Sequence, residues 1–130
     1  MSVPVDRKYT RTHEWVQIDG DVVTIGITDY AQNELGDITY VELPGIGDML
    51  GKADSFGIVE SVKAASDIYM PVGGEITDAN ADTETAPELL NTSPYQDAWL
   101  IRVKVSDAAD LEELMDAGTY QEFIEAEGGH

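Results

Sequence analysis

The chain has 130 residues, with 7 Lys and Arg against 26 Asp and Glu, which gives a formal net charge of −19. Its hydrophobic fraction of 42% is enough for one folded domain, because domains of about 100–200 residues are common. A surface this acidic repels phosphate backbones, so the charge excludes nucleic acid as a partner. The absence of cysteine excludes disulfides, thiolate metal sites and a cysteine nucleophile.

Membrane and export signals are missing from the sequence. No apolar run approaches the roughly 20 residues of a membrane span, and residues 1–7 are not followed by the apolar region of a secretion signal. The sequence therefore predicts one cytoplasmic domain over residues 1–130, without contact to a membrane.

The acidic residues are scattered from Asp6 to Glu127 and do not form one tail. This distribution favours a surface adapted to high salt, where screening shortens to about 3 Å at 1 M and self-repulsion fades. Steering of basic partners is the alternative. We expect the melting temperature to rise between dilute buffer and molar salt in a thermal denaturation series. A melting temperature that stays constant would contradict the salt adaptation.

The first half of the chain predicts short strands with turns between them. Alternating apolar residues predict a β-hairpin over residues 15–27, with its turn at 19–21. Thr28 or Asp29 is a suitable cap for a short helix that ends at Gly36. Further strands are predicted near residues 38–43, 53–62, 66–70 and 75–77, with breaker-rich turns at 44–48 and 71–74.

The segment 80–97 is polar and contains Pro87 and Pro94. It predicts a surface connection with at most one turn of helix, at residues 88–90. Residues 99–105 alternate between apolar and polar side chains, which predicts another strand.

Two helices are predicted to close the chain, over residues 107–127. Asp107 is a suitable cap for the first helix, and Gly118 is a suitable end. Thr119 and Glu122 have the spacing of a capping box, which predicts that the second helix begins there. Strands first and helices last predict an α+β fold that is mainly β, with a β core over about residues 9–105.

Lys63 stands apart from the other basic residues, because no Lys or Arg occurs between it and Arg102. It falls at the tip of the predicted hairpin between strands 56–62 and 66–70. The small neighbours Ala64 and Ala65 leave its amine exposed there. From these features alone, an ordinary solvated lysine is the expected interpretation.

Motifs for catalysis or for metal binding are weak in this sequence. His13 and the distant His130 have no closely spaced third ligand, so no metal site is predicted. A nucleophile elbow, a phosphate loop and a dinucleotide-binding glycine pattern are all absent. The sequence does not indicate an independent enzyme.

Six segments of the chain resemble the glycine-cleavage H proteins, in the order and spacing of that family. They are Tyr9 with His13-Glu14-Trp15, and the segments 26–32, 40–44, 57–76, 91–95 and 99–100. Segment 57–76, which reads Gly-Ile-Val-Glu-Ser-Val-Lys-Ala-Ala-Ser-Asp-Ile-Tyr-Met-Pro-Val-Gly-Gly-Glu-Ile, resembles the lipoyl-lysine loop of the family. The resemblance covers nearly the whole chain.

The resemblance implies a barrel-sandwich hybrid of the lipoyl and biotinyl type, with a short helix in the N-terminal half and helices at the C-terminus. It implies lipoate attached covalently to Lys63, in a carrier that is not itself an enzyme. It also implies a cleft for the aminomethyl-lipoyl arm, at the positions of Thr12, Glu14, Ile27 and Asp67. In that cleft a protonated amine is held by a carboxylate, for which Glu14 is the first candidate and Asp67 the second.

The partners implied by the resemblance belong to glycine cleavage. The carrier takes an aminomethyl group from the pyridoxal-phosphate glycine decarboxylase and presents it to the tetrahydrofolate-dependent aminomethyltransferase. Dihydrolipoamide dehydrogenase, a FAD enzyme, reoxidises it, and a lipoate ligase or lipoyl transferase modifies it. Two alternatives remain open: a lipoyl relay protein that donates lipoyl groups to other carriers, and an unmodified acidic adaptor.

Overall fold

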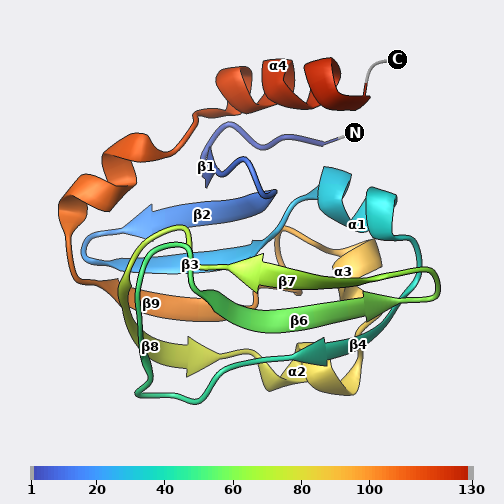
Figure 1. Ribbon diagram of the computed structural model, residues 1–130, viewed down its shortest axis with the longest axis horizontal. Coiled ribbons are helices and arrows are strands. Elements are labelled where there is room, and N and C mark those ends of the chain that lie inside the picture. Colours follow the sequence, from blue (N-terminus) through green and yellow to red (C-terminus); the bar gives the residue numbers. More distant parts are fainter. Residues whose placement is uncertain (1, 129–130) are drawn as a thin grey trace.

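The computed structural model describes residues 2–128 and consists mainly of strands in two antiparallel sheets (Figure 1). The six-stranded sheet has the order β1 (Lys8–Tyr9), β2 (Glu14–Asp19), β3 (Val22–Ile27), β9 (Ile101–Val105), β8 (Gly74–Ala79) and β5 (Met49–Leu50). The three-stranded sheet has the order β4 (Ile38–Glu42), β6 (Ser55–Ser61) and β7 (Ala65–Tyr69). One cluster of buried apolar side chains contains residues of both sheets. The mainly β, α+β prediction is therefore confirmed.

The predicted N-terminal hairpin is formed by β2 and β3. Asp19 and Val22 are partners in the register, so the loop contains only Gly20 and Asp21. Gly20 has a φ of 66°, a left-handed conformation that glycine adopts without steric cost. The alternation that predicted this hairpin comes from one strand face that is buried, where Val16, Val23 and Ile25 are fully covered.

The predicted short helix is α1 (Asp29–Leu35). The Thr28 side chain accepts a hydrogen bond from the backbone N–H of Ala31, and Gly36 ends the helix with a φ of 80°. Both end signals in the sequence are confirmed, because each supplies a backbone partner or a conformation that the helix itself cannot supply.

The segment after β8 differs from the prediction, because it contains two helices, α2 (Ala81–Thr85) and α3 (Leu89–Thr92). Asn80 is the reason for the first: its side chain accepts from the N–H of Asp82 and donates to two backbone carbonyls further along the chain. Leu90 in α3 is fully buried in the core. The turn of helix predicted at residues 88–90 corresponds to α3, whereas α2 and the burial of Leu90 were not predicted, because polar residues and prolines dominate this segment.

The first C-terminal helix begins as predicted, because Asp107 caps it by accepting the N–H of Ala109, but it is shorter than predicted and is not an α-helix. The chain forms a 3-10 helix, η1 (Ala108–Glu113), and is then extended. Met115 pairs with Tyr9 through two backbone hydrogen bonds, each 2.8 Å long. This pairing with the sheet edge draws Met115 out of a helical conformation and is the physical reason for the difference.

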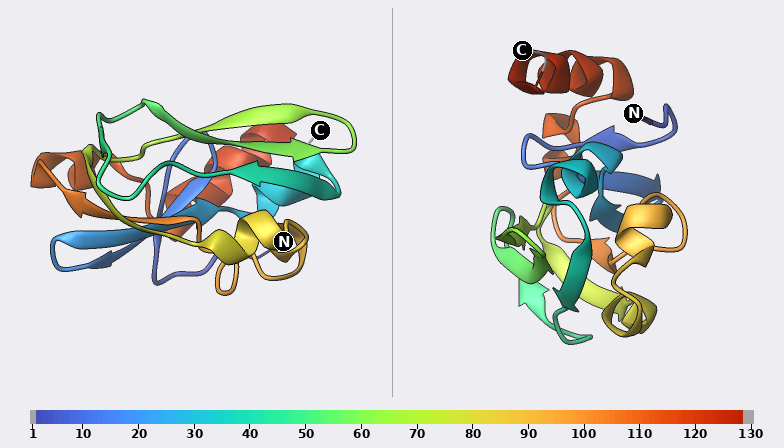
Figure 2. Two further views of the ribbon diagram at one scale, coloured as in Figure 1. Left: turned by 90° about the horizontal axis from the view of Figure 1, so that it is seen from below. Right: turned by 90° about the vertical axis from the view of Figure 1, so that its right-hand side faces the viewer.

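The last helix, α4 (Ala117–Gly128), begins before the predicted capping box. The Asp116 carboxylate accepts the N–H of Thr119 at 2.8 Å, and Gly118 lies inside the helix instead of ending one. As predicted, Tyr120 and Ile124 are buried on its apolar face. The helix lies along the N-terminal segment (Figure 1; Figure 2). In residues 2–128, no helix has both the length and the apolar character needed to cross a bilayer.

Candidate functional site

Lys63 lies where the sequence predicts it, in the turn between β6 and β7. Ser61 and Ala64 close this turn, because the N–H of Ser61 donates to the carbonyl of Ala64 at 2.7 Å. The Ser61 hydroxyl oxygen in turn accepts the backbone N–H groups of Lys63 and Ala64 at 3.3 and 3.2 Å. The two loop residues, Val62 and Lys63, are exposed. The turn is thus held by its own hydrogen bonds and presents Lys63 to solvent.

The tip of this hairpin is attached to the segment that follows α1. The backbone N–H of Val62 donates to the carbonyl of Asp37 at 3.1 Å. The stem of Lys63 lies over Gly36, where an added Cβ would be 3.3 Å from Cε of the lysine. Two views show the hairpin tip beside this connection (Figure 1; Figure 2). The lysine therefore stands on a base made by two parts of the chain.

Asn91 of α3 fixes that base from the other side. Its side-chain amide donates to the carbonyl of Gly36 and to Gln32, both at 2.9 Å, and its oxygen accepts the N–H of Ile38 at 2.9 Å. One side chain thus binds the end of α1 and the start of β4 together. The sequence offers Asn91 only as part of a family-like segment, and no local pattern reveals this role.

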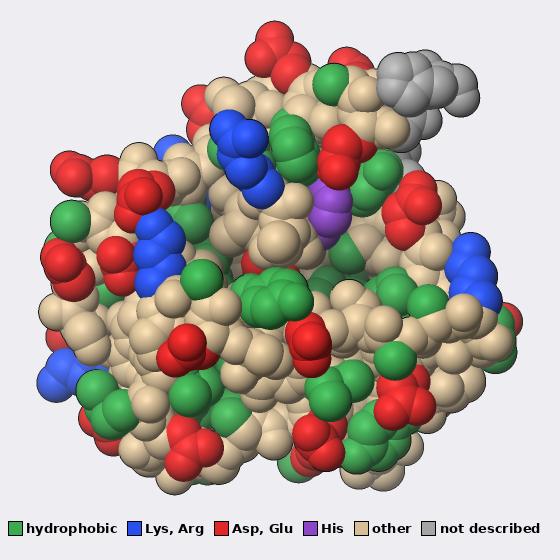
Figure 3. All heavy atoms as spheres, viewed as in Figure 1, with side chains coloured by type: hydrophobic (Ala, Val, Ile, Leu, Met, Phe, Trp, Pro, Cys, Tyr) green, Lys and Arg blue, Asp and Glu red, His purple; other side chains and the backbone are tan. Residues whose placement is uncertain are grey.

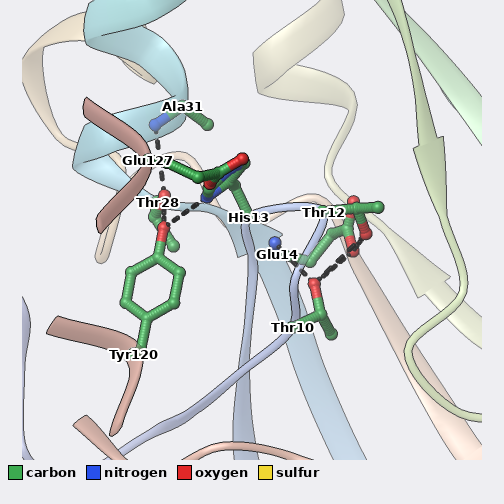
Figure 4. A network of polar contacts seen from close by, with 8 residues as sticks. All are labelled: Thr10, Thr12, His13, Glu14, Thr28, Ala31, Tyr120 and Glu127. Carbon is green, nitrogen blue, oxygen red and sulfur yellow. Dashed lines mark hydrogen bonds and ion pairs between the residues drawn. The ribbon is translucent and has the colours of Figure 1, made fainter. Parts of the chain in front are cut away.

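Glu14 is the main buried acid of the site, with only 2% of its surface exposed. The hydroxyls of Thr10 and Thr12 donate to its Oε1 at 2.6 and 2.5 Å (Figure 4). The N–H of Tyr69 donates to its Oε2 at 3.4 Å. Burial raises the pKa of Glu14, and these hydrogen bonds offset the rise in part. The acid is held in one orientation, with partners that favour its charged form.

Glu14 opens onto a cleft of about 580 Å³. The cleft is lined by Tyr9, Thr10, Arg11, Thr12, Glu14, Lys52, Ala53, Tyr69, Met70, Pro71, Glu113, Leu114 and Met115. The surface is hollowed below α4 in the space-filling view, and the cleft lies between residues 9–14 and 113–115 on one side and residues 52–53 and 69–71 on the other (Figure 3). A cleft of this kind, mostly apolar with a few polar groups, is typical of a site for a small organic group.

The four residues predicted for the cleft are placed differently from one another. Thr12 and Glu14 line it together. Ile27 is the register partner of Glu14 on β3 and belongs to the apolar core, with 4% of its surface exposed. Asp67 is exposed on β7 and accepts a hydrogen bond from the Ser55 hydroxyl at 3.4 Å. Neither Ile27 nor Asp67 is among the lining residues, although both lie close to residues that are.

Strand β7 leads from the lysine to the cleft. Lys63 precedes its first residue by two positions, and its last residue, Tyr69, lines the cleft and donates to Glu14. The strand spans four residue steps, or about 13 Å. Asp67 lies on the same strand face as Tyr69, two positions earlier. The amine and the cleft are therefore at the two ends of one strand.

His13 holds the C-terminal helix against this site. It has a φ of 71°, and its Nδ1 is hydrogen-bonded to the Tyr120 hydroxyl at 2.8 Å. Its Nε2 lies 3.3 Å from the Glu127 carboxylate (Figure 4). Burial lowers the pKa of His13, and the charge of Glu127 opposes that shift. His130, the other histidine of the weak metal signal, lies outside the described residues.

Several lining residues were missed by the sequence interpretation, because they lie far along the chain from Thr10 and Thr12. Glu113, Leu114 and Met115 approach the cleft because the chain at the end of η1 returns to pair with Tyr9, and Lys52 approaches it from the loop between β5 and β6. Their separation from Thr10 and Thr12 along the chain leaves no spacing to detect. Thr10 has a weak sequence signal as a cleft residue, because it places a second hydroxyl two positions before Thr12.

Comparisons with known proteins agree on one family. The family model "Glycine cleavage H-protein" matches residues 7–127. A glycine cleavage system H protein of Thermus thermophilus is 54% identical over 127 residues, which are 98% of this chain and 99% of that protein. That of Carboxydothermus hydrogenoformans is 50% identical over 126 residues, which are 97% of each chain.

Among solved structures, the crystal structure of a glycine cleavage system H protein from Mycobacterium marinum matches with a TM-score of 0.85. It is 36% identical, and the match covers 97% of this chain and 99% of the other. The fold, the sequence relatives and the family model thus point the same way. The chain belongs to the glycine cleavage H-protein family.

Proposed function

We propose that the protein is the lipoyl-bearing shuttle of a glycine cleavage system, with lipoate attached to Lys63 through an amide. The observation that carries the proposal is an exposed amine on a fixed two-residue turn, at one end of a strand whose other end lines a cleft. When bound, the lipoyl group supplies a disulfide that accepts an aminomethyl group. The chain itself acts as a non-catalytic carrier, because the chemistry takes place on partner enzymes.

Lys63 and its turn provide a site that a modifying enzyme can reach. Acylation of the amine removes its positive charge, and neighbouring Val62 leaves an apolar surface at the tip, with 70% of its own surface exposed. A lipoate ligase or lipoyl transferase is the partner for this step. The hydrogen bonds of Ser61 keep the turn in one shape when the amine is acylated, since none of them involves the lysine side chain.

The cleft fits the loaded arm by size and by charge. Its apolar walls exclude water from an alkyl chain, while the Glu14 carboxylate faces the ammonium of an aminomethyl cargo. Thr10 and Thr12 orient that carboxylate through one oxygen. Within residues 2–128, the second oxygen accepts a single long hydrogen bond, from Tyr69. Asp67 is placed to attract the ammonium on its way along β7.

Three partner enzymes follow from the proposed cycle. The pyridoxal-phosphate glycine decarboxylase loads the aminomethyl group, and the tetrahydrofolate-dependent aminomethyltransferase unloads it. The FAD-containing dihydrolipoamide dehydrogenase restores the disulfide. Tethering the cargo to Lys63 replaces free diffusion by a high local concentration at each partner. Membership of the glycine cleavage H-protein family favours this shuttle over the relay protein and the unmodified adaptor.

The attachment is tested by tandem mass spectrometry of the peptide that contains Lys63, from protein produced in cells supplied with lipoate. We expect the lipoyl mass on Lys63 and unmodified peptides for Lys8, Lys52 and Lys104. A fully unmodified Lys63 under these conditions would contradict the proposal, as would a lipoyl group on any of the other three lysines.

Glu14→Gln is expected to shorten the lifetime of the loaded arm about tenfold while still allowing it to load, since a hydrogen bond to a charged group contributes about 1.5 kcal/mol or more. Gln keeps an oxygen for Thr10 and Thr12 but loses the charge that faces the cargo. The release of formaldehyde from isolated loaded protein measures this lifetime. Glu75→Gln, at an exposed position on β8, is the matched control. Equal lifetimes for the two variants would refute the role of Glu14.

A further inference from the structure

The segment formed by residues 110–115, here called the strap, builds one wall of the cleft. Glu113, Leu114 and Met115 line the cleft directly. The strap crosses from η1 to the start of α4 and approaches the site from a part of the chain remote from Glu14. Its position decides whether this side of the cleft is closed to water.

Three sets of polar contacts hold the strap in place. The Asp110 carboxylate accepts the N–H of Gly73 at 3.0 Å. Met115 exchanges two backbone hydrogen bonds with Tyr9. Between these two anchors, the ammonium of Lys52 forms an ion pair with the Glu113 carboxylate. The ion pair joins the strap to the loop before β6, on the opposite side of the cleft.

The ion pair differs from the other two anchors in its exposure. The Lys52 and Glu113 side chains are 38% and 62% exposed, so the pair lies at the mouth of the cleft and is open to solvent. Exposed ion pairs are weak and salt-dependent, which makes this contact the one that is most easily broken and remade. Opening of the strap as a whole would have to break all three.

Charge balance in the cleft gives the pair a second effect. Arg11 and Lys52 bring two positive charges to the lining, and Glu14 and Glu113 bring two negative charges. A cationic cargo is repelled by Lys52 unless Glu113 neutralises it. The two residues are therefore coupled to the cargo through charge as well as through closure, and an experiment has to separate these effects.

We propose that Lys52 and Glu113 are positioning residues that hold the strap closed over the cleft and thereby shield the aminomethyl cargo from water. The inference rests on the proposed function, in which the loaded arm occupies this cleft. Water destroys the cargo by a balanced hydrolysis: the thioether R–S–CH2–NH3⁺ and H2O give the thiol R–SH, formaldehyde and NH4⁺. Each opening of the strap admits the water that this reaction consumes.

The functional test compares Lys52→Met and Glu113→Gln, which break the same ion pair but change the cleft charge in opposite directions. Closure predicts that both variants hydrolyse the cargo faster, by about two- to fivefold, the range for an exposed ion pair. Formaldehyde release from isolated loaded protein is the measurement. Asp78→Asn, which breaks the exposed ion pair with Arg102 on other strands, is the control and should match the parent.

Three outcomes of this comparison would overturn the proposal. Unchanged rates in both variants would show that the pair does not control access to the cargo. Rates that move in opposite directions would show that only the charge of the lining matters. An equal acceleration in Asp78→Asn would also overturn the proposal, because the loss of an ion pair remote from the cleft would then have the same effect on hydrolysis.

A second measurement does not involve lipoate and uses the same substitutions in a Lys63→Arg background. Hydrogen exchange of the Tyr9 and Met115 amides reports opening of the strap, because the N–H of each residue donates to the carbonyl of the other. We expect their exchange to accelerate about two- to fivefold in both variants, with no change at Val103 in the central strand β9. Equal acceleration at Val103 would indicate general destabilisation and would overturn the proposal. A parent protein that fails to load would instead contradict the proposed function, while this exchange test would still decide whether the pair closes the strap.

Discussion

Lys63→Arg is expected to abolish lipoylation and all aminomethyl transfer, while the stability of the fold changes by less than about 0.5 kcal/mol. The arginine guanidinium keeps the positive charge, but it cannot form the amide bond to lipoate. The side chain is exposed, and the hydrogen bonds of the turn involve its backbone, so the fold loses almost nothing. Intact mass and a thermal melt measure the two effects separately.

Lys104→Arg is the matched control for this substitution. Lys104 is also an exposed lysine, on β9, and its replacement should leave the lipoyl mass increment unchanged. A lipoyl increment that persists in Lys63→Arg would place the modification elsewhere. A large fall in the melting temperature of Lys63→Arg would show that the side chain supports the hairpin instead of standing free of it.

Gly57→Ala is expected to destabilise the protein by about 2–3 kcal/mol, which lowers the melting temperature by about 6–12 °C. A Cβ at this buried position would lie 2.3 Å from the backbone oxygen of Glu42 on the neighbouring strand β4. That oxygen cannot turn aside as a flexible side chain would, so the strands β4 and β6 would have to separate. Calorimetry or chemical denaturation measures the loss.

Gly118→Ala provides the opposite case for comparison. Gly118 lies within α4, and an added Cβ would meet its nearest neighbour, the Asp116 carboxylate, at an ordinary 3.7 Å. Alanine is the better helix former, so this variant should gain about 0.5–1 kcal/mol. A melting temperature of Gly57→Ala equal to that of the parent would show that the close approach of β4 to β6 does not matter for stability.

Local patterns predicted the parts of the fold that depend on neighbouring residues. Alternation gave the hairpin of β2 and β3, because Val16, Val23 and Ile25 share one fully buried face. Thr28 and Gly36 gave the ends of α1, because caps act within one helical turn. The exposed place of Lys63 followed from a short turn with small neighbours. In each case, the decisive contact lies within a few residues along the chain.

The parts that were missed depend on contacts between remote segments. Met115 is extended because Tyr9, far away along the chain, supplies its backbone partners. Leu90 attaches α3 to the core, and the polar residues around it in the sequence concealed this burial. The strap side of the cleft has the same origin. A pattern read within a short window contains no information about such pairings, whereas the resemblance to a family did point to Thr12 and Glu14.

Asp37 binds the hairpin tip through the N–H of Val62, and Asn91 binds the neighbouring Gly36 and Ile38, which affects how far a group tethered at the tip can search. If lipoate is attached to Lys63 as proposed, the hydrogen bonds of this base restrict the turn, and the attached group would search chiefly by rotations about its own single bonds. The frequency of encounters inside a docked enzyme is then fixed by tether geometry and not by fluctuations of the polypeptide. A more mobile hairpin would enlarge the volume that the group searches and lower its effective concentration at each partner enzyme.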